Sequence, residues 1–345
     1  MNRSKIAIGG LSFALATSAL AASAMAAEKI EWNLSAWGNP RAATVCVDVL
    51  SQYVEEKSGG NFTIKVHYGE TISPAKENLD GLKIGAFEIG NICSGYHPGK
   101  NLALTVLDLP FLPITSLEQQ AKVSEAFYQL APVKEEAARW NAAITFRNLL
   151  PQSEFLGRGK PPTTLEGWKG MRVRALGGTG QAMEKIGAIP TSVPAPEVYT
   201  GIERGMFDAV AFPFSYAHGS YRVHEVSDWY TFNMAPGVNH CLTLHNIAAF
   251  EALPAEYRQL IEEAKAISYE KSIEAFKAAD EKWIPLFDQN GLERILYSDE
   301  VLAAFREIAA KPVWEEWVQD VTARGVPGQE LLDFVMAEAK KSAGS

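Results

Sequence analysis

Hydrophobic residues along this chain recur with two spacings, at every second residue in some segments and at every third or fourth residue in others. The first spacing predicts a β-strand with one buried face, and the second predicts an amphipathic helix. In the first part of the chain the spacings alternate over five segments: strands at 29–35, 61–68 and 87–93, with helices at 42–57 and 75–84 between them. Strands joined by helices in this order predict a parallel sheet covered by helices on its faces.

A second unit repeats this order further along the chain. It comprises strands at 171–175 and 207–212, helices at 179–186 and 197–206, and a short extended piece at 189–193. Between the two units, the segment 149–164 is rich in proline and glycine and is interpreted as a hinge crossing. Because a mature chain of roughly 320 residues exceeds what one hydrophobic core usually serves, we expect two lobes.

The C-terminal third predicts one strand followed by long helices. The strand covers 241–250, and Pro254 suits the first position of a helix that runs about thirty residues, long enough to span both lobes. Two further helices cover 301–324 and 329–341. The predicted fold class is α/β, with two lobes that each hold a mixed, mostly parallel sheet flanked by helices. Lobe 1 is assigned residues 27–150 and 240–279, and lobe 2 is assigned residues 151–239 and 280–345, which include the C-terminal helices.

The N-terminus has the composition of a targeting segment. Arg3 and Lys5 form a basic start, residues 6–20 are apolar, and Ala24-Met25-Ala26 is a small-x-small cleavage site. We therefore interpret residues 1–26 as a signal peptide that exports the protein to the periplasm. The apolar run is too short for a membrane span and no later stretch approaches one, so no membrane insertion of the mature protein is predicted.

The charge balance narrows the class of partner. The chain has 32 Lys and Arg residues against 41 Asp and Glu residues, and loss of the signal peptide leaves a formal charge of −11. An acidic protein is a poor partner for nucleic acid or for an anionic membrane surface. Any anionic ligand must then be bound by a local positive site that acts against the overall field.

Arg174 is the best candidate for such a site. It lies at the end of the strand 171–175 and is followed at once by Gly177-Gly178-Thr179-Gly180. Ligands of open α/β sheets bind at the carboxyl ends of strands, where a guanidinium offers a fork of donors that fits a carboxylate. The alternative is a surface arginine on an edge strand, and spacing alone does not separate the two. The glycines are interpreted as a helix start that needs close approach and that offers free N–H groups to an anion.

Aromatic residues gather at the same predicted sheet edges. Phe212, Phe214 and Tyr216 follow the last strand of the second unit, while Trp37 and Tyr96 follow the first and third strands of the first unit. These five are candidates for a pocket wall, and the alternative for each is a place in the core.

Residues typical of catalysis and metal binding are not arranged for either role. The sequence has no Gly-x-Ser-x-Gly, His-Glu-x-x-His or Gly-Lys-Ser/Thr motif, and its six histidines have no metal-ligand spacing. No cofactor and no metal are predicted. The three cysteines, Cys46, Cys93 and Cys241, are interpreted as small buried hydrophobes, with a Cys93–Cys241 bridge as the less favoured alternative.

Four motifs in order give the chain a resemblance to a known family. They are Gly170-Met-Arg-Val-Arg174, Glu197-Val198-Tyr199, Gly205-Met-Phe-Asp208-Ala209, and the Asp-Leu-Pro-Phe-Leu segment at 108–112. Together they resemble the solute-binding proteins of TRAP (tripartite ATP-independent periplasmic) transporters over essentially the whole mature chain. The resemblance implies a periplasmic binding protein fold whose two lobes close on a ligand and deliver it to a membrane permease.

The resemblance also implies the roles of several residues. The family's carboxylate-binding arginine matches Arg174, while Gly177 and Phe212 stand where relatives often have polar ligand contacts. A second arginine of some relatives would fall near Glu154, and Arg158 is the nearest basic residue. These departures favour a monocarboxylate with an apolar or aromatic body. The full set of candidate ligand contacts is Arg174, Phe212, Trp37, Tyr96, Tyr216, Phe214, Arg158, Gly177 and His240.

The leading prediction is thus a monomeric, non-enzymatic binding protein for a small organic acid, with TRAP permease subunits as its membrane partners. Two alternatives remain open from the sequence. One is a periplasmic lyase or isomerase that acts on a carboxylate, and the other is the ligand-binding component of a sensory system.

Overall fold

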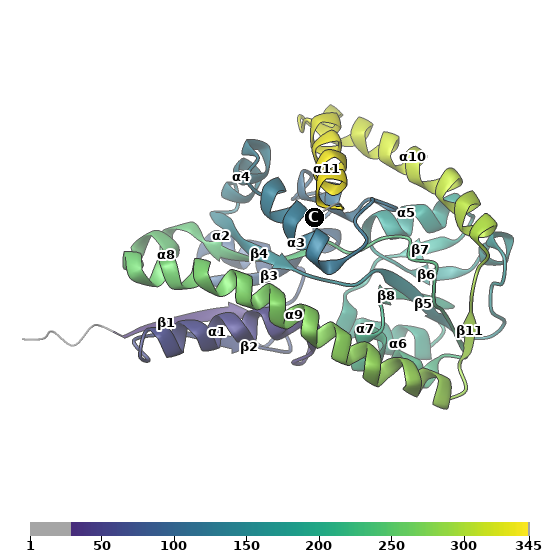
Figure 1. Cartoon of the computed structure of the whole chain (residues 1–345), viewed down its shortest axis with the longest axis horizontal. Helices are drawn as coiled ribbons and strands as arrows, with labels where there is room; N and C mark the ends of the chain where they lie inside the picture. Colours follow the sequence, from purple (N-terminus) through teal and green to yellow (C-terminus); the bar gives the residue numbers. More distant parts are fainter. Residues whose placement is uncertain (1–28, 344–345) are drawn as a thin grey trace, which may run out of the picture.

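The computed structural model describes residues 29–343, so the predicted signal peptide lies outside the described part of the chain. Two sheets form the centres of two lobes, with helices around them (Figure 1). The α/β class and the two lobes predicted from the sequence are confirmed by this arrangement. In the described residues, no helix is both long enough and apolar enough to cross a membrane.

The sheet of lobe 1 has the order β2-β1-β3-β10-β4. Its strands are β1 (Ile30–Ser35), β2 (Phe62–His67), β3 (Ile89–Cys93), β4 (Ala142–Asn148) and β10 (Cys241–Asn246). The strand β1 runs parallel to β2 and β3, whereas β10 is antiparallel to both of its neighbours. A strand from late in the chain therefore completes the first sheet.

The sheet of lobe 2 has the order β11-β9-β5-β8-β6-β7. Its strands are β5 (Ser153–Gly157), β6 (Arg172–Arg174), β7 (Ile189–Thr191), β8 (Ala209–Pro213), β9 (Trp229–Thr231) and β11 (Glu293–Ile295). Here β5 is the antiparallel strand, paired with β8 and β9. Each sheet thus has one strand, β10 or β5, that is antiparallel to its two neighbours. In both sheets this strand is formed by the chain just after it has crossed from the other lobe.

Helices cover both sheets and connect the lobes. They are α1 (Val45–Lys57), α2 (Asn78–Ile84), α3 (Leu117–Phe127), α4 (Ala131–Ala138), α5 (Gly177–Lys185), α6 (Val198–Glu203), α7 (Tyr216–Ser220), α8 (Ile247–Ala252), α9 (Ala255–Gln289), α10 (Asp299–Ala323) and α11 (Gly328–Ser342). The predicted strand 241–250 is too long, because Asn246 ends β10 and its side chain caps α8 by accepting a hydrogen bond from the backbone N–H of Ala249.

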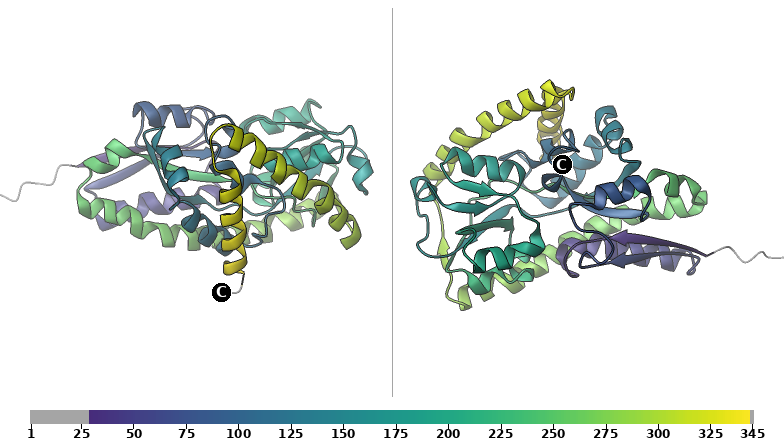
Figure 2. Two further views of the ribbon diagram at one scale, coloured as in Figure 1. Left: turned by 90° about the horizontal axis from the view of Figure 1, so that it is seen from above. Right: turned by 180° about the vertical axis from the view of Figure 1, so that it is seen from behind.

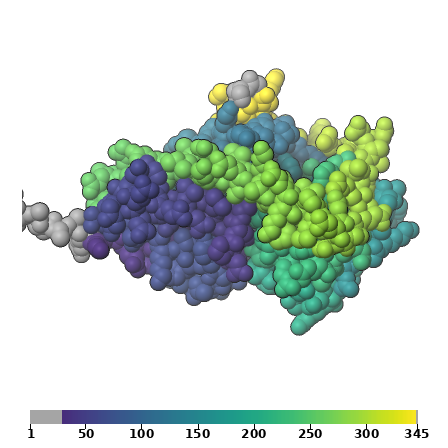
Figure 3. All heavy atoms as spheres, turned by 60° about the horizontal axis from the view of Figure 1, so that its bottom comes forward, coloured from purple at the N-terminus to yellow at the C-terminus, as the bar shows by residue number. Residues whose placement is uncertain are grey.

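The long helix α9 spans both lobes, as predicted. It packs against α1 in lobe 1 and α7 in lobe 2, and Figures 2 and 3 show it lying along both halves of the molecule. The C-terminal helices return over both lobes, since α10 packs on α5 while α11 packs on α3 and on the short helix η3 (Leu104–Asp108). The residue boundaries given above for the two lobes stay a prediction.

One hydrophobic cluster joins the lobes at their centre. It includes Trp37, Cys93 and Tyr96 from lobe 1 together with Phe212 and Tyr216 from lobe 2. The carboxyl ends of β1, β3 and β8 lead into this cluster. The candidate contacts from both units therefore meet in one place, which is where the site is built.

Candidate ligand-binding site between the lobes

The strand β6 places Arg174 in the interior of lobe 2. The strand β6 lies between β8 and β7 in the sheet, so the alternative that Arg174 is a surface residue on an edge strand is wrong. Arg174 is 0 % exposed, while Arg172 on the same strand is exposed and forms an ion pair with Asp208 (Nη2 to Oδ1, 2.5 Å). The strand therefore separates two arginines, one in solvent with an acidic partner and one buried.

The buried guanidinium is held by neutral groups. Its Nε and Nη2 donate to the carbonyl of Val193 (3.1 and 2.7 Å), and its Nη1 donates to the carbonyl of Ala211 (3.0 Å). Its central carbon lies 4.7 Å from the centre of the Phe212 ring. No carboxylate of the described residues forms an ion pair with it. Burial lowers the pKa of Arg174, although nearby tyrosines, Tyr96 foremost, partly offset this effect.

A small cavity of about 40 Å³ opens beside Arg174, and both lobes line it. Five of the predicted contacts lie in its wall: Trp37, Tyr96, Arg174, Phe212 and Tyr216. The remaining polar wall consists of the amides Asn91, Asn148 and Asn239, of Arg41 and of Tyr221. None of the described residues that line it is an aspartate or glutamate. A larger groove of about 830 Å³ lies outside, and Arg41 and Tyr221 line both spaces.

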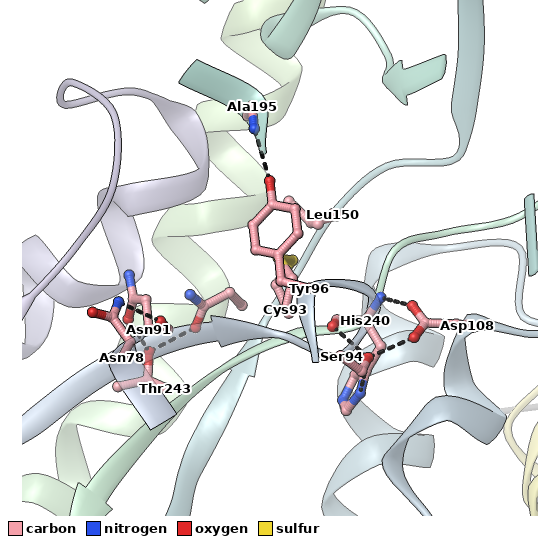
Figure 4. The surroundings of a disulfide bond; sticks show 12 residues. Asn78, Asn91, Cys93, Ser94, Tyr96, Asp108, Leu150, Ala195, His240 and Thr243 are labelled. Carbon is pink, nitrogen blue, oxygen red and sulfur yellow. Dashed lines mark hydrogen bonds between the residues drawn. A yellow bond between two sulfur atoms is a disulfide. The ribbon is translucent and has the colours of Figure 1, made fainter. Parts of the chain in front are cut away.

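Tyr96 links the two lobes across the cavity. It lies in η2 (Ser94–Tyr96), directly after β3, and its hydroxyl accepts a hydrogen bond of 3.0 Å from the backbone N–H of Ala195 in lobe 2 (Figure 4). Its ring meets Trp37 edge to face with centroids 5.7 Å apart. The described form of the protein is thus closed, with the two lobes in contact around the cavity.

Cys93 and Cys241 form a disulfide in the cavity wall (Figure 4). Both residues are buried, as expected, but they are bridged, so the less favoured alternative is the correct one. The strands β3 and β10 are antiparallel, and their register places the two cysteines directly opposite each other, with Cα atoms 3.9 Å apart. That pairing depends on a strand 148 residues away in sequence, which spacing alone does not reveal. Cys46 is buried and free, as expected.

Four predicted contacts do not line the cavity. Phe214 packs among aromatic rings of lobe 2, stacked on Tyr230 at 6.1 Å. Arg158 is exposed and donates to the carbonyls of Ile202 and Glu203. Each residue comes directly after its strand, and neither side chain is part of the cavity wall. Their role as ligand contacts stays a prediction.

The other two, Gly177 and His240, both lie beside Asp108; Gly177 is exposed, whereas His240 is buried. Gly177 begins α5 with φ of +47° and faces the Asp108 side chain. The His240 ring bonds Tyr128 (Nε2 to hydroxyl, 2.7 Å), and its backbone N–H donates to Asp108 (2.6 Å; Figure 4). Burial lowers the pKa of His240 and raises the pKa of Asp108 to about 6. Gly177, His240 and Asp108 therefore lie behind the cavity wall and do not line the cavity.

Sequence reasoning missed Arg41 and Tyr221. Both lie outside the strand ends on which the predictions were based, Arg41 at the start of the first helical region and Tyr221 just after α7. A signal was present for Arg41, because Gly38-Asn39-Pro40 directly after β1 marks a tight loop at the ligand-binding edge of the sheet.

Comparison with known proteins identifies the family. Residues 42–320 match the family described as bacterial extracellular solute-binding protein, family 7 (DctP). The chain belongs to this family. Its members are periplasmic receptors that bind small organic acids and work with membrane TRAP permeases, and they are not enzymes.

Individual relatives share about a quarter or less of the sequence. The monocarboxylate 2-oxoacid-binding periplasmic protein of Nostoc sp. is 23% identical over 309 residues, 84% of this chain and 83% of its own. The ectoine-binding periplasmic protein of Halomonas elongata is 25% identical over 306 residues, 85% of this chain and 86% of its own.

Solved structures share the fold. A TRAP solute-binding protein of Rhodoferax ferrireducens in complex with copurified benzoate superposes with a TM-score of 0.81 at 21% identity, covering 92% of this chain and 99% of its own. One from Desulfovibrio salexigens with bound orotic acid gives 0.81 at 18% identity, covering 91% and 99%. These similarities confirm the two-lobed architecture.

Proposed function

We propose that this protein is exported through its signal peptide and, as a monomer in the periplasm, binds a small organic acid whose carboxylate is held by Arg174. The bound acid is then delivered to a TRAP permease. The observation that carries the proposal is a fully buried guanidinium in a cavity wall that has carbonyl partners but no acidic one. A buried charge without a counter-ion is costly, so an anion that enters the cavity is strongly favoured.

The geometry of Arg174 fits one carboxylate. A guanidinium carries five N–H donors, and the bonds to Val193 and Ala211 leave one N–H free on Nη1 and one on Nη2. These two N–H groups can donate to the two oxygens of a carboxylate. Trp37 and Tyr96 offer ring surfaces to the rest of the ligand, and Phe212, whose ring faces Arg174 on one side and Tyr221 on the other, adds its ring edge. This wall supports a flat, apolar or aromatic body. Relatives named for benzoate, orotic acid and 2-oxoacids fit this class.

Calorimetry on the mature protein with a panel of aromatic and aliphatic acids tests the proposal. Arg174→Gln should weaken binding of the best acid by about 30-fold or more, because loss of one partner from a buried charge pair costs about 2–5 kcal/mol. The control is Arg172→Gln, which removes an exposed guanidinium from the same strand and should leave the affinity unchanged. Binding of the uncharged amide of the same acid with equal affinity, or an unaffected Arg174→Gln variant, would rule the proposal out.

A further inference from the structure

A second cation lines the cavity. Arg41 of lobe 1 donates from Nη1 to the carbonyls of Trp37 (2.8 Å) and Asn39 (2.9 Å), while its Nε is buried and has no hydrogen-bond partner. The hydroxyl of Tyr221, from lobe 2, is buried and unpartnered in the same way. Both side chains belong to the cavity wall. Two buried donors without acceptors point to a group that the ligand supplies.

The two arginines lie at the two ends of one aromatic stack. Arg174 packs on the Phe212 ring at 4.7 Å, Phe212 stacks on Tyr221 at 5.4 Å with an interplanar angle of 27°, and Arg41 lies 5.5 Å from the Tyr221 ring centre. Two rings therefore stand between the guanidiniums. A single carboxylate that occupies the fork of Arg174 leaves the donors of Arg41 and Tyr221 to another part of the ligand.

Charge leads to the same conclusion. Neither Arg41 nor Arg174 forms an ion pair within residues 29–343, and the described wall of the cavity has no acidic side chain. A ligand with one carboxylate neutralises one of two buried cations, whereas a dianion neutralises both.

The backbone leaves room for this arrangement at Gly38. Its φ is +67°, and a Cβ atom there would come within 2.5 Å of the Tyr221 hydroxyl oxygen and 2.9 Å of Arg41 Nη1. A side chain at this position would displace both donors, so the loop after β1 is shaped around them.

We infer that Arg41 and Tyr221 form a second oxygen-binding subsite, and that the ligand is an aromatic acid with a second anionic group on the ring, the class of a benzenedicarboxylate. The inference rests on the proposed function, because it takes Arg174 as the site of the first carboxylate. Each lobe then contributes one guanidinium, and the closed form is favoured when one ligand engages both.

The test is calorimetric titration of the mature protein with benzoate and with the three benzenedicarboxylate isomers. At least one isomer should bind the wild-type protein more tightly than benzoate. Arg41→Gln should weaken that isomer by about tenfold or more and should change benzoate affinity by less than about threefold, since a charge-assisted hydrogen bond is worth about 1.5–3 kcal/mol. Tyr221→Phe should show the same selectivity with a smaller loss. Arg204→Gln, which removes an exposed guanidinium, is the matched control for net charge.

The outcomes separate the two proposals. Equal weakening of benzoate and dicarboxylate by Arg41→Gln, or no effect on either, overturns the second subsite while Arg174 remains the anchor. Failure of every acid to bind wild-type protein, or binding that survives in Arg174→Gln, overturns the proposed function itself. If Arg41→Gln does not fold, Tyr221→Phe gives the decision: a loss of affinity confined to the dicarboxylate supports the inference, and equal effects on the dicarboxylate and benzoate, or no effect on either, contradict it.

Discussion

At the scale of single residues, burial decides which charged groups act in the cavity. Arg172 and Arg174 are two positions apart on β6, yet only Arg174 is removed from solvent and from carboxylates. Because side chains alternate between the two faces of a strand, Arg172 and Arg174 are expected on the same face of β6. This alternation does not predict that Asp208 forms an ion pair with Arg172. Arg174 was accessible to sequence reasoning because a strand end is a fixed place in an α/β sheet. The loop Gly38-Asn39-Pro40 marks the position of Arg41 in the sequence, but the direction of the Arg41 side chain could not be predicted, because carbonyls of its own loop set that direction.

Burial also makes stability depend on pH through histidine. His245 stacks on Phe250 with centroids 4.2 Å apart, and desolvation with the nearby Lys265 lowers its pKa to about 4. In the unfolded chain its pKa is about 6.5, so the unfolded state takes up the proton first, and stability falls as pH falls from about 6.5 to about 4. At pH 5 this group alone lowers the free energy of unfolding by about 2 kcal/mol relative to neutral pH.

Urea denaturation at pH 7.5 and pH 5 measures this effect. In His245→Gln the difference between the two free energies of unfolding should shrink by about 2 kcal/mol, whatever the variant's absolute stability. An unchanged difference would show that His245 titrates normally in the folded protein.

At the scale of elements, close contact between lobes depends on the glycines that begin α5. A Cβ atom on Gly178 would come within 2.9 Å of the Leu109 Cα and 2.7 Å of the Pro110 Cδ, so the helix start lies directly against the chain that follows η3. The sequence interpretation of these glycines as a helix start that needs close approach agrees with this geometry. By contrast, the sequence did not predict β4 and β5. All residues of β5 and most residues of β4 are buried, so neither strand shows the alternation of hydrophobic and polar residues on which the predictions depended.

Two alanine substitutions in α5 separate close approach from helix propensity. Gly178→Ala should lower the free energy of unfolding by about 1–3 kcal/mol, because the methyl group meets backbone atoms that have no room to move. Gly180→Ala should raise it by about 0.5–1 kcal/mol, because its Cβ would meet atoms at 3.4 Å or beyond and alanine favours the helix. Thermal and urea unfolding of both variants checks the pair, and similar effects of the two substitutions would contradict the contact described.

At the scale of the whole molecule, the ligand enters only if the lobes part. The closed cavity of about 40 Å³ has room for only a few waters, and the bond from Ala195 to Tyr96 crosses the interface beside it. Hinge closure around a ligand is a common way to expel water and strengthen an ion pair. The length of the chain and its repeated pattern predicted two lobes. The contacts that hold the lobes together could not be predicted, because they join side chains that are far apart in the sequence, such as Tyr96 and Ala195.

A covalent link between the lobes tests the need for opening. A Cβ atom on Gly95 of lobe 1 would lie 3.2 Å from the Cβ of Leu176 of lobe 2, close to the separation of about 3.5–4.5 Å found in disulfides. The oxidised Gly95→Cys/Leu176→Cys variant should take up ligand far more slowly than its reduced form in stopped-flow measurements. Each single variant and the wild-type protein, treated alike, control for reduction of the native Cys93–Cys241 bridge. Equally fast uptake by protein whose new disulfide is verified by mass spectrometry would show that the ligand reaches the cavity without opening.

The most direct test of the central claim is a crystal structure of the mature protein with the tightest acid of the panel. The account predicts that both carboxylate oxygens lie within hydrogen-bond distance of Nη1 and Nη2 of Arg174, with the ring of the acid between the two lobes and against Trp37 and Tyr96, in a cavity wider than the one described above. An acid bound in the outer groove, or a carboxylate turned away from an Arg174 that keeps only Val193 and Ala211 as partners, would contradict it.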